Sequence, residues 1–118
     1  MTIQNLINKV QEEKPNSFSN EKLLSFVNEI ETEAAHELSE DFTPYESIDD
    51  TVLIVPAPYD RLYVSYLKAM IDYSNEEYAS YQLNAEQHAQ DYADFTNWIV
   101  RENVNVESVV PSRFRNVF

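Results

Sequence analysis

Glycine and cysteine are both absent from this chain of 118 residues. Without glycine the chain has no Gly-rich phosphate-binding loop and no glycine-based hairpin turn, which argues against the enzyme folds that depend on them. Without cysteine it can form no disulfide, no thiolate metal site and no thiol nucleophile, and the redox compartment stays undetermined.

Basic residues are scarce as well. The chain has 8 Lys and Arg against 21 Asp and Glu, a formal net charge of -13 at pH 7. Direct binding to nucleic-acid phosphates or to an anionic membrane surface rests on Lys and Arg, so this charge argues against both. No apolar run approaches the roughly 20 residues of a membrane span, and the first residues do not resemble a secretion signal.

The apolar content predicts a folded chain. Hydrophobic residues make up 43% of the sequence and aromatic residues 13%, more than an acidic disordered chain carries. Because the chain is too short for two independent cores, we expect one small domain.

Two helices are predicted in the first third of the chain. An apolar stripe over residues 3–10 indicates the first, which the Lys14-Pro15 pair ends. Ser19 is suited to cap the second, with Glu21 in the positive first turn, and the helical spacing continues to Leu38.

The middle of the chain is predicted to be extended. From Glu29 to Asp50 there are nine carboxylates and no Lys or Arg. Residues 51–55 are β-branched and form either a lone strand or an extended segment against the core. Pro56-Ala57-Pro58 ends this segment and prepares a helix start.

The C-terminal half is predicted to contain two long helices. The first runs from Asp60 to about Gln82, and Leu83-Asn84 forms the joint, with Asn84 as the cap of a last helix that ends near Asn103. The predicted fold class is therefore all-α: a small four-helix bundle with two long C-terminal helices, an extended middle segment and an extended C-terminal arm.

The arm is a separate unit in this interpretation, with residues 1–103 forming the helical domain and residues 104–118 the arm. It is apolar and β-branched, with two arginines and no acidic residue after Glu107. A frayed terminus is the ordinary expectation, but this composition favours docking on a neighbour, by strand addition or in a groove. The candidate interface residues are Val110, Arg113, Phe114, Arg115 and Phe118.

Catalytic and metal-binding patterns are weak. Glu33 and His36 have the Glu-x-x-His spacing of di-iron bundles, but such bundles need a second motif, and His88 has no glutamate three residues before it. An acid–base group on the last helix would consist of Glu86, Asp91 and Asp94. Carboxylates at this spacing are common on exposed helices, so we expect no enzyme activity, no metal and no cofactor.

Aromatic residues crowd the last two predicted helices. They are Tyr59, Tyr63, Tyr66, Tyr73, Tyr78, Tyr81, Tyr92, Phe95 and Trp98. Most are expected to fill the seam between antiparallel helices. Tyr73 and Tyr81 do not fit that seam and are candidates for a protein interface, where tyrosine is enriched.

Several sequence blocks resemble one family. Pro-Ala-Pro-Tyr-Asp-Arg-Leu-Tyr at residues 56–63, Ala-Met-Ile-Asp-Tyr at residues 69–73 and Asn-Glu-Glu-Tyr at residues 75–78 are similar to the head–tail connector (adaptor or head-completion) proteins of long-tailed phages and prophages of Gram-positive bacteria. Further blocks of the resemblance are residues 14–22 and 98–101, and in total it covers roughly residues 3–103. Family members often carry Asn-Gly in the stretch matched here by residues 74–76, and this chain lacks that glycine.

The resemblance implies a structural virion protein of the neck. Such proteins are helical bundles that form a ring beneath the portal, typically of twelve copies, which extends the DNA channel and presents a platform for the next component. The implied partners are the phage portal protein, neighbouring copies of this chain and the next neck or tail-completion protein, with no membrane partner. DNA would pass through the channel without specific binding. The implied location is the head–tail interface of the virion, with assembly in the host cytoplasm.

Within this hypothesis the acidic stretch is a candidate lumen-facing or portal-facing surface. Its residues are Glu29, Glu33, Glu37, Glu40 and Asp41. The residues expected to pack the bundle and position the long helix are Tyr59, Asp60, Tyr63 and Trp98. Because copies of charge -13 repel one another, we expect a monomer or small oligomer in solution that closes into a ring on the portal.

An acidic DNA mimic that inhibits a host DNA-binding enzyme is the alternative. A mimic would spread its carboxylates along one face like phosphates, and it would not need Arg113 and Arg115. Here the acids cluster between Glu29 and Asp50, which favours the connector.

Overall fold

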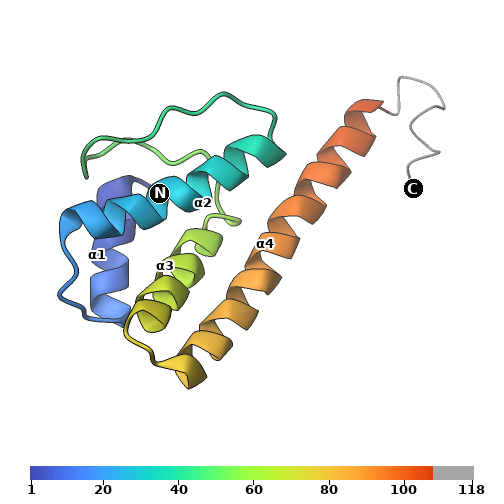
Figure 1. The fold of residues 1–118 in the computed structure, drawn as a ribbon. Coiled ribbons are helices and arrows are strands. Elements are labelled where there is room, and N and C mark those ends of the chain that lie inside the picture. The colour runs from blue at the N-terminus through green and yellow to red at the C-terminus, as the bar shows by residue number, and fades with distance from the viewer. Residues whose placement is uncertain (108–118) are drawn as a thin grey trace.

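The computed structural model describes residues 1–107, which form four helices (Figure 1). They are α1 (Ile3–Glu13), α2 (Asn20–Glu37), α3 (Arg61–Ser74) and α4 (Tyr78–Glu107). Residues 1–107 contain no multi-residue strand, so the predicted all-α class is confirmed. Helices α1, α2 and α3 surround a common core, and α4 packs along α3 and continues beyond it (Figure 1).

Side-chain caps start the first two helices. Thr2 Oγ1 accepts a hydrogen bond from the Asn5 backbone N–H at 3.1 Å, and Ser19 Oγ accepts one from the Lys22 N–H at 3.1 Å. The predicted Ser19 cap is therefore confirmed. Each cap satisfies a donor that the first helical turn leaves unpaired.

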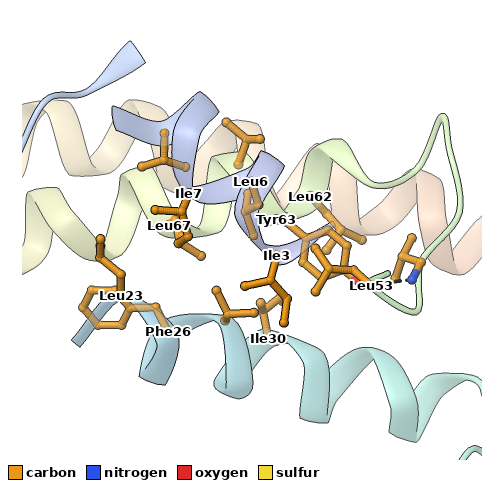
Figure 2. Close-up of a cluster of buried hydrophobic side chains, with 14 of the residues drawn as sticks. Ile3, Leu6, Ile7, Leu23, Phe26, Ile30, Leu53, Leu62, Tyr63 and Leu67 are labelled. Carbon is orange, nitrogen blue, oxygen red and sulfur yellow. Dashed lines mark hydrogen bonds between the residues drawn. The ribbon is translucent and has the colours of Figure 1, made fainter. Parts of the chain in front are cut away.

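The core lies where the apolar stripes of α1, α2 and α3 meet (Figure 2). Its larger members include Ile3, Leu6, Leu23, Phe26, Ile30, Leu62, Tyr63, Leu67 and Ile71. Phe95 is the contribution of α4 to the fully buried set among the described side chains. Since burial of one such side chain stabilises by about 1.5–3 kcal/mol, most of the apolar stabilisation comes from the first three helices.

The middle segment is extended and lies against this core. Thr2 and Val52 form one isolated antiparallel bridge, and the Leu53 N–H donates to the Met1 carbonyl oxygen at 2.9 Å. Leu53 and Val55 are buried, whereas Val52 is 67% exposed. Of the two predicted alternatives, the structure shows the extended segment.

The joint between the last two helices differs from the prediction. Helix α3 ends at Ser74, and Asn84 lies inside α4 instead of capping it. The turn is a Schellman motif, in which the Glu77 N–H donates to the Asp72 carbonyl oxygen at 2.9 Å and Glu76 has a left-handed φ of 59°. In a chain without glycine, no residue type marked this turn. Helix α3 has 14 residues and α4 has 30, so only one C-terminal helix is long.

The C-terminal end of α4 also differs from the prediction. The helix continues through Asn103 to Glu107, so the predicted boundary at residue 103 falls inside a helix. Asparagine costs only a few tenths of a kcal/mol in a helix interior, and the next proline is Pro111. The remainder of the predicted arm, residues 108–118, lies outside the described residues.

Candidate functional site

A fully buried carboxyl group ties the middle segment to the helices. Glu31 on α2 is 0% exposed. Its Oε2 accepts hydrogen bonds from the Tyr45 hydroxyl at 2.5 Å and the Ile54 N–H at 3.0 Å, and its Oε1 accepts one from the Tyr63 hydroxyl at 2.5 Å. The Tyr63 hydroxyl in turn accepts a hydrogen bond from the Val55 N–H at 2.9 Å. Glu31 therefore positions the extended segment that covers the core.

Both tyrosines of this network remain hydrogen-bond donors at neutral pH. Burial, with the nearby charge of Glu31, raises the pKa of Tyr63 well above its ordinary value. Burial, with the hydrogen bond to Glu31, raises the pKa of Tyr45 as well.

Sequence reasoning did not identify Glu31 as a key residue. Its place in the apolar stripe of the helix, between Val27 and Ala34, was a usable signal of burial.

The predicted positioning residues lie in different surroundings. Tyr59, in the turn before α3, stacks on Trp98 of α4 with ring centroids 5.2 Å apart, and its hydroxyl accepts a hydrogen bond from Arg101 at 3.2 Å. Tyr63 belongs to the core and to the Glu31 network. Asp60 directly precedes α3 without a side-chain capping bond, and its carboxylate lies 3.7 Å from the Met1 amino group. The turn thus connects the N-terminus, α3 and α4.

A second buried carboxylate, Asp72, joins three helices at their common end. Its Oδ2 accepts hydrogen bonds from Ser80 Oγ and Asn84 Nδ2, each at 2.7 Å. Its Oδ1 has an ion-pair partner, Lys14 Nζ at 2.5 Å, although that contact is not aligned as a hydrogen bond. Burial by itself would raise the pKa of Asp72, but the close contact and positive charge of Lys14, together with the hydrogen bonds from Ser80 and Asn84, outweigh burial and lower it.

The predicted acidic surface consists of exposed side chains: Glu29, Glu33, Glu37, Glu40 and Asp41. The first three are spaced one turn apart on α2, about 6 Å along the helix axis, and the other two follow the helix. Glu29 accepts a hydrogen bond from the Tyr66 hydroxyl at 3.0 Å. Among the described side chains, no Lys or Arg forms an ion pair with any of the five. The surface therefore carries uncompensated negative charge.

A groove separates this surface from α4. It has a volume of about 470 Å³ and is lined by Glu33, His88, Ala89, Tyr92, Ala93 and Thr96. A second hollow of about 430 Å³ is lined by Thr32, Glu33, His36, Glu37 and Tyr92. Because Glu33 and Tyr92 line both, we treat the two as one feature, the α2–α4 groove. Burial, with a further contribution from the charges of Glu37 and Glu33, raises the pKa of Tyr92 to about 12.

His88 anchors α4 at the floor of the groove. Its Nδ1 lies 3.0 Å from the Leu62 carbonyl oxygen, which can only accept, so Nδ1 carries the proton. Its ring packs against Tyr66 and Tyr92. Burial lowers the pKa of His88, against the effect of the Leu62 hydrogen bond, and keeps the ring neutral at neutral pH.

Two of the three acid–base candidates, Asp91 and Asp94, share one cationic partner, Arg61. Asp91 is buried and lies 3.4 Å from Arg61 Nε, and Asp94 lies 3.0 Å from Arg61 Nη2, so both belong to one ion-pair cluster. Within the described residues, no group of three or more His, Asp or Glu side chains could hold a metal ion.

Two further interfaces were predicted, one at the exposed tyrosines Tyr73 and Tyr81 and one at the arm. Tyr73 is 54% exposed and contacts Tyr78 and Tyr81 at the α3–α4 turn. The arm residues lie outside the described part of the chain: Val110, Arg113, Phe114, Arg115 and Phe118.

No helix within residues 1–107 has both the length and the apolar character needed to cross a membrane. Comparison of the chain with protein-family models, with curated proteins and with solved structures finds no match.

Proposed function

We propose that this protein is a structural neck component of a tailed phage, a connector that forms a ring beneath the portal and joins head to tail. The observation that carries the proposal is the exposed acidic surface on α2, which has no basic partner among the described side chains. A DNA channel must let the duplex slide, and a wall of carboxylates repels phosphates. The blocks at residues 56–63 and 69–73 add the family resemblance.

The turn after α3 supports the same proposal. Glu76 has a φ of 59°, a conformation that glycine adopts at no steric cost. Connectors that this chain resembles often carry Asn-Gly in the stretch matched by residues 74–76. The backbone here has the shape for which that glycine is suited.

Native mass spectrometry of the protein, alone and mixed with the portal protein of the same genome, tests the proposal. We expect a monomer or small oligomer alone, because each copy carries a charge of -13, and about twelve copies captured per portal ring, the number that the family resemblance implies. Failure to bind the portal at any salt concentration would remove the connector proposal.

A matched pair of variants tests whether the arm contributes to assembly. Arg113→Gln with Arg115→Gln should weaken capture on the portal, whether the arm docks on the portal or on the neighbouring copy. Lys9→Gln with Lys22→Gln removes the same charge from exposed positions elsewhere and should capture normally. Equal capture by both double variants would show that the arm is not part of the assembly contact.

An acidic DNA mimic is the second candidate, favoured by the spacing of the carboxylates on α2. Glu29, Glu33 and Glu37 repeat every four residues, about 6 Å along the axis, which is close to every second phosphate of one DNA strand. This candidate would gain if portal binding fails and the protein instead displaces DNA from a host enzyme.

A further inference from the structure

The α2–α4 groove combines a floor of small or aromatic side chains with a negative rim. Ala89 and Ala93 leave room above the helix, and the ring of Tyr92 forms part of the wall. Glu33 and Glu37 lie at the α2 side, and neither forms an ion pair with any described side chain. Such a groove suits an extended segment that carries both a bulky apolar side chain and positive charge.

The sequence contains one segment of this chemistry. Residues 108–118 read Ser-Val-Val-Pro-Ser-Arg-Phe-Arg-Asn-Val-Phe, with no acidic residue. In an extended chain, side chains alternate between two sides. Phe114 would therefore face the floor while Arg113 and Arg115 reach toward the rim carboxylates.

The groove lies far back along α4 from Glu107. It is therefore easier to reach for residues 108–118 of another copy than for those of the same chain. A reversal after Glu107 has no glycine or asparagine in residues 108–111 for a tight two-residue turn. If four residues make the reversal, Arg115 returns about 13 Å at roughly 3.3 Å per residue. At 1.5 Å per residue of helix, a return of 13 Å from Glu107 brings Arg115 only to about the level of residue 98. The α4 residues that line the groove run from His88 to Thr96.

We propose that the α2–α4 groove of one copy binds residues 108–118 of a neighbouring copy. The inference deepens the proposed function and rests on it, because the neighbouring copy is the next subunit of the ring. Glu33 and Glu37 of each copy then supply the counter-charge for the arginines of its neighbour. Glu29, Glu40 and Asp41 do not line the groove and keep their negative charge.

Site-specific disulfide trapping tests this arrangement, and the absence of cysteine from the chain makes the experiment clean. Ala89→Cys is placed in one full-length copy and Ser112→Cys in another, and the two are mixed and oxidised at about 0.1 M NaCl. We expect a disulfide-linked pair. Gln87→Cys is the matched control, because Gln87 is exposed but lines a different hollow with residues of α1 and α3. It should form the pair about tenfold less.

A pair of charge variants tests whether the carboxylates of the groove attract the arginines of residues 108–118. Glu33→Gln with Glu37→Gln in the Ala89→Cys copy should lower the yield of the pair severalfold. Glu12→Gln with Glu21→Gln removes two exposed carboxylates elsewhere and should leave the yield unchanged. Equal yields from Ala89→Cys and Gln87→Cys, or from the two charge variants, would overturn the proposal. So would an intramolecular disulfide in a dilute Ala89→Cys/Ser112→Cys double variant, since the segment would then occupy its own groove.

Disulfide trapping and capture by the portal can fail independently, so the two experiments distinguish the groove assignment from the connector proposal. Trapping without capture by the portal would leave the groove assignment standing and remove the connector. Capture by the portal without trapping, measured on the captured ring, would remove the groove assignment and leave the connector.

Discussion

Glu31 and Glu33 lie two residues apart on α2 and have opposite surroundings. Glu31 is fully buried and accepts three hydrogen bonds, from two tyrosine hydroxyls and one backbone N–H. Glu33 is exposed beside the α2–α4 groove and has no cationic partner among the described side chains. The two side chains point about 200° apart around the helix. The residue type is the same, and the packing of the extended segment on one face of α2 decides which carboxyl group is structural.

The largest expected effect is the loss of the Glu31 network. Glu31→Ala leaves both tyrosine hydroxyls and the Ile54 N–H without their acceptor in the core, so we expect a loss of about 3–5 kcal/mol in the free energy of unfolding. Glu33→Ala should change it by less than about 0.5 kcal/mol. Urea unfolding of both variants measures the contrast, and equal losses would contradict it.

Asp72 extends the comparison to a buried carboxylate that has a cationic partner. Asp72→Asn should cost about 2–3 kcal/mol at neutral pH, because it removes the ion pair with Lys14 and disturbs the bonds to Ser80 and Asn84. The folded state lowers the pKa of Asp72. The stabilisation is therefore present above the unfolded pKa of about 3.9 and is lost as the pH falls through the folded value.

The difference in unfolding free energy between the natural chain and Asp72→Asn should therefore shrink on acidification. Urea unfolding at neutral pH and at a pH below about 3.9 tests this. A difference that stays constant with pH would show that Asp72 acts through packing and not through its charge.

The smallest expected effect on stability concerns Glu76, an exposed glutamate in the turn between α3 and α4. Glu76 lies on the surface but holds a φ of 59°, so Glu76→Gly should stabilise the protein by up to about 1 kcal/mol and raise Tm by a few degrees. Glu77→Gly is the matched control in the same turn, where φ is not positive, and it should stabilise less or destabilise. If both glycines have the same effect, the turn does not store the expected strain.

Local signals predicted the first half of the fold well. Ser19 marked the start of α2, the Lys14-Pro15 pair followed the end of α1 closely, and the apolar spacing placed both stripes in the core. The joint of α3 and α4 was missed because a glutamate at position 76 carries no sign of a left-handed turn. That turn is held in place by the Asp72 ion pair with Lys14, which directly follows α1, and by the Asp72 hydrogen bonds to two side chains of α4. The Glu77 N–H bond to the Asp72 carbonyl oxygen adds to this.

The candidate site was predictable only in part. The exposure of the five acidic residues followed from their charge, since carboxylates without a partner stay in water. The α2–α4 groove could not be read from the sequence, because it depends on how the C-terminal end of α2 approaches α4 once α4 packs on α3 (Figure 1).

By itself, the sequence determined the helical class, the apolar stripes of α1 and α2, the Ser19 cap of α2 and the strongly acidic character of the chain. These properties depend on side-chain chemistry and on spacing within one helix. Only the tertiary structure decided which glutamate of α2 is buried, where α3 ends and what lines the groove. Each of these depends on hydrogen bonds and contacts between segments far apart in the chain, which local spacing does not encode.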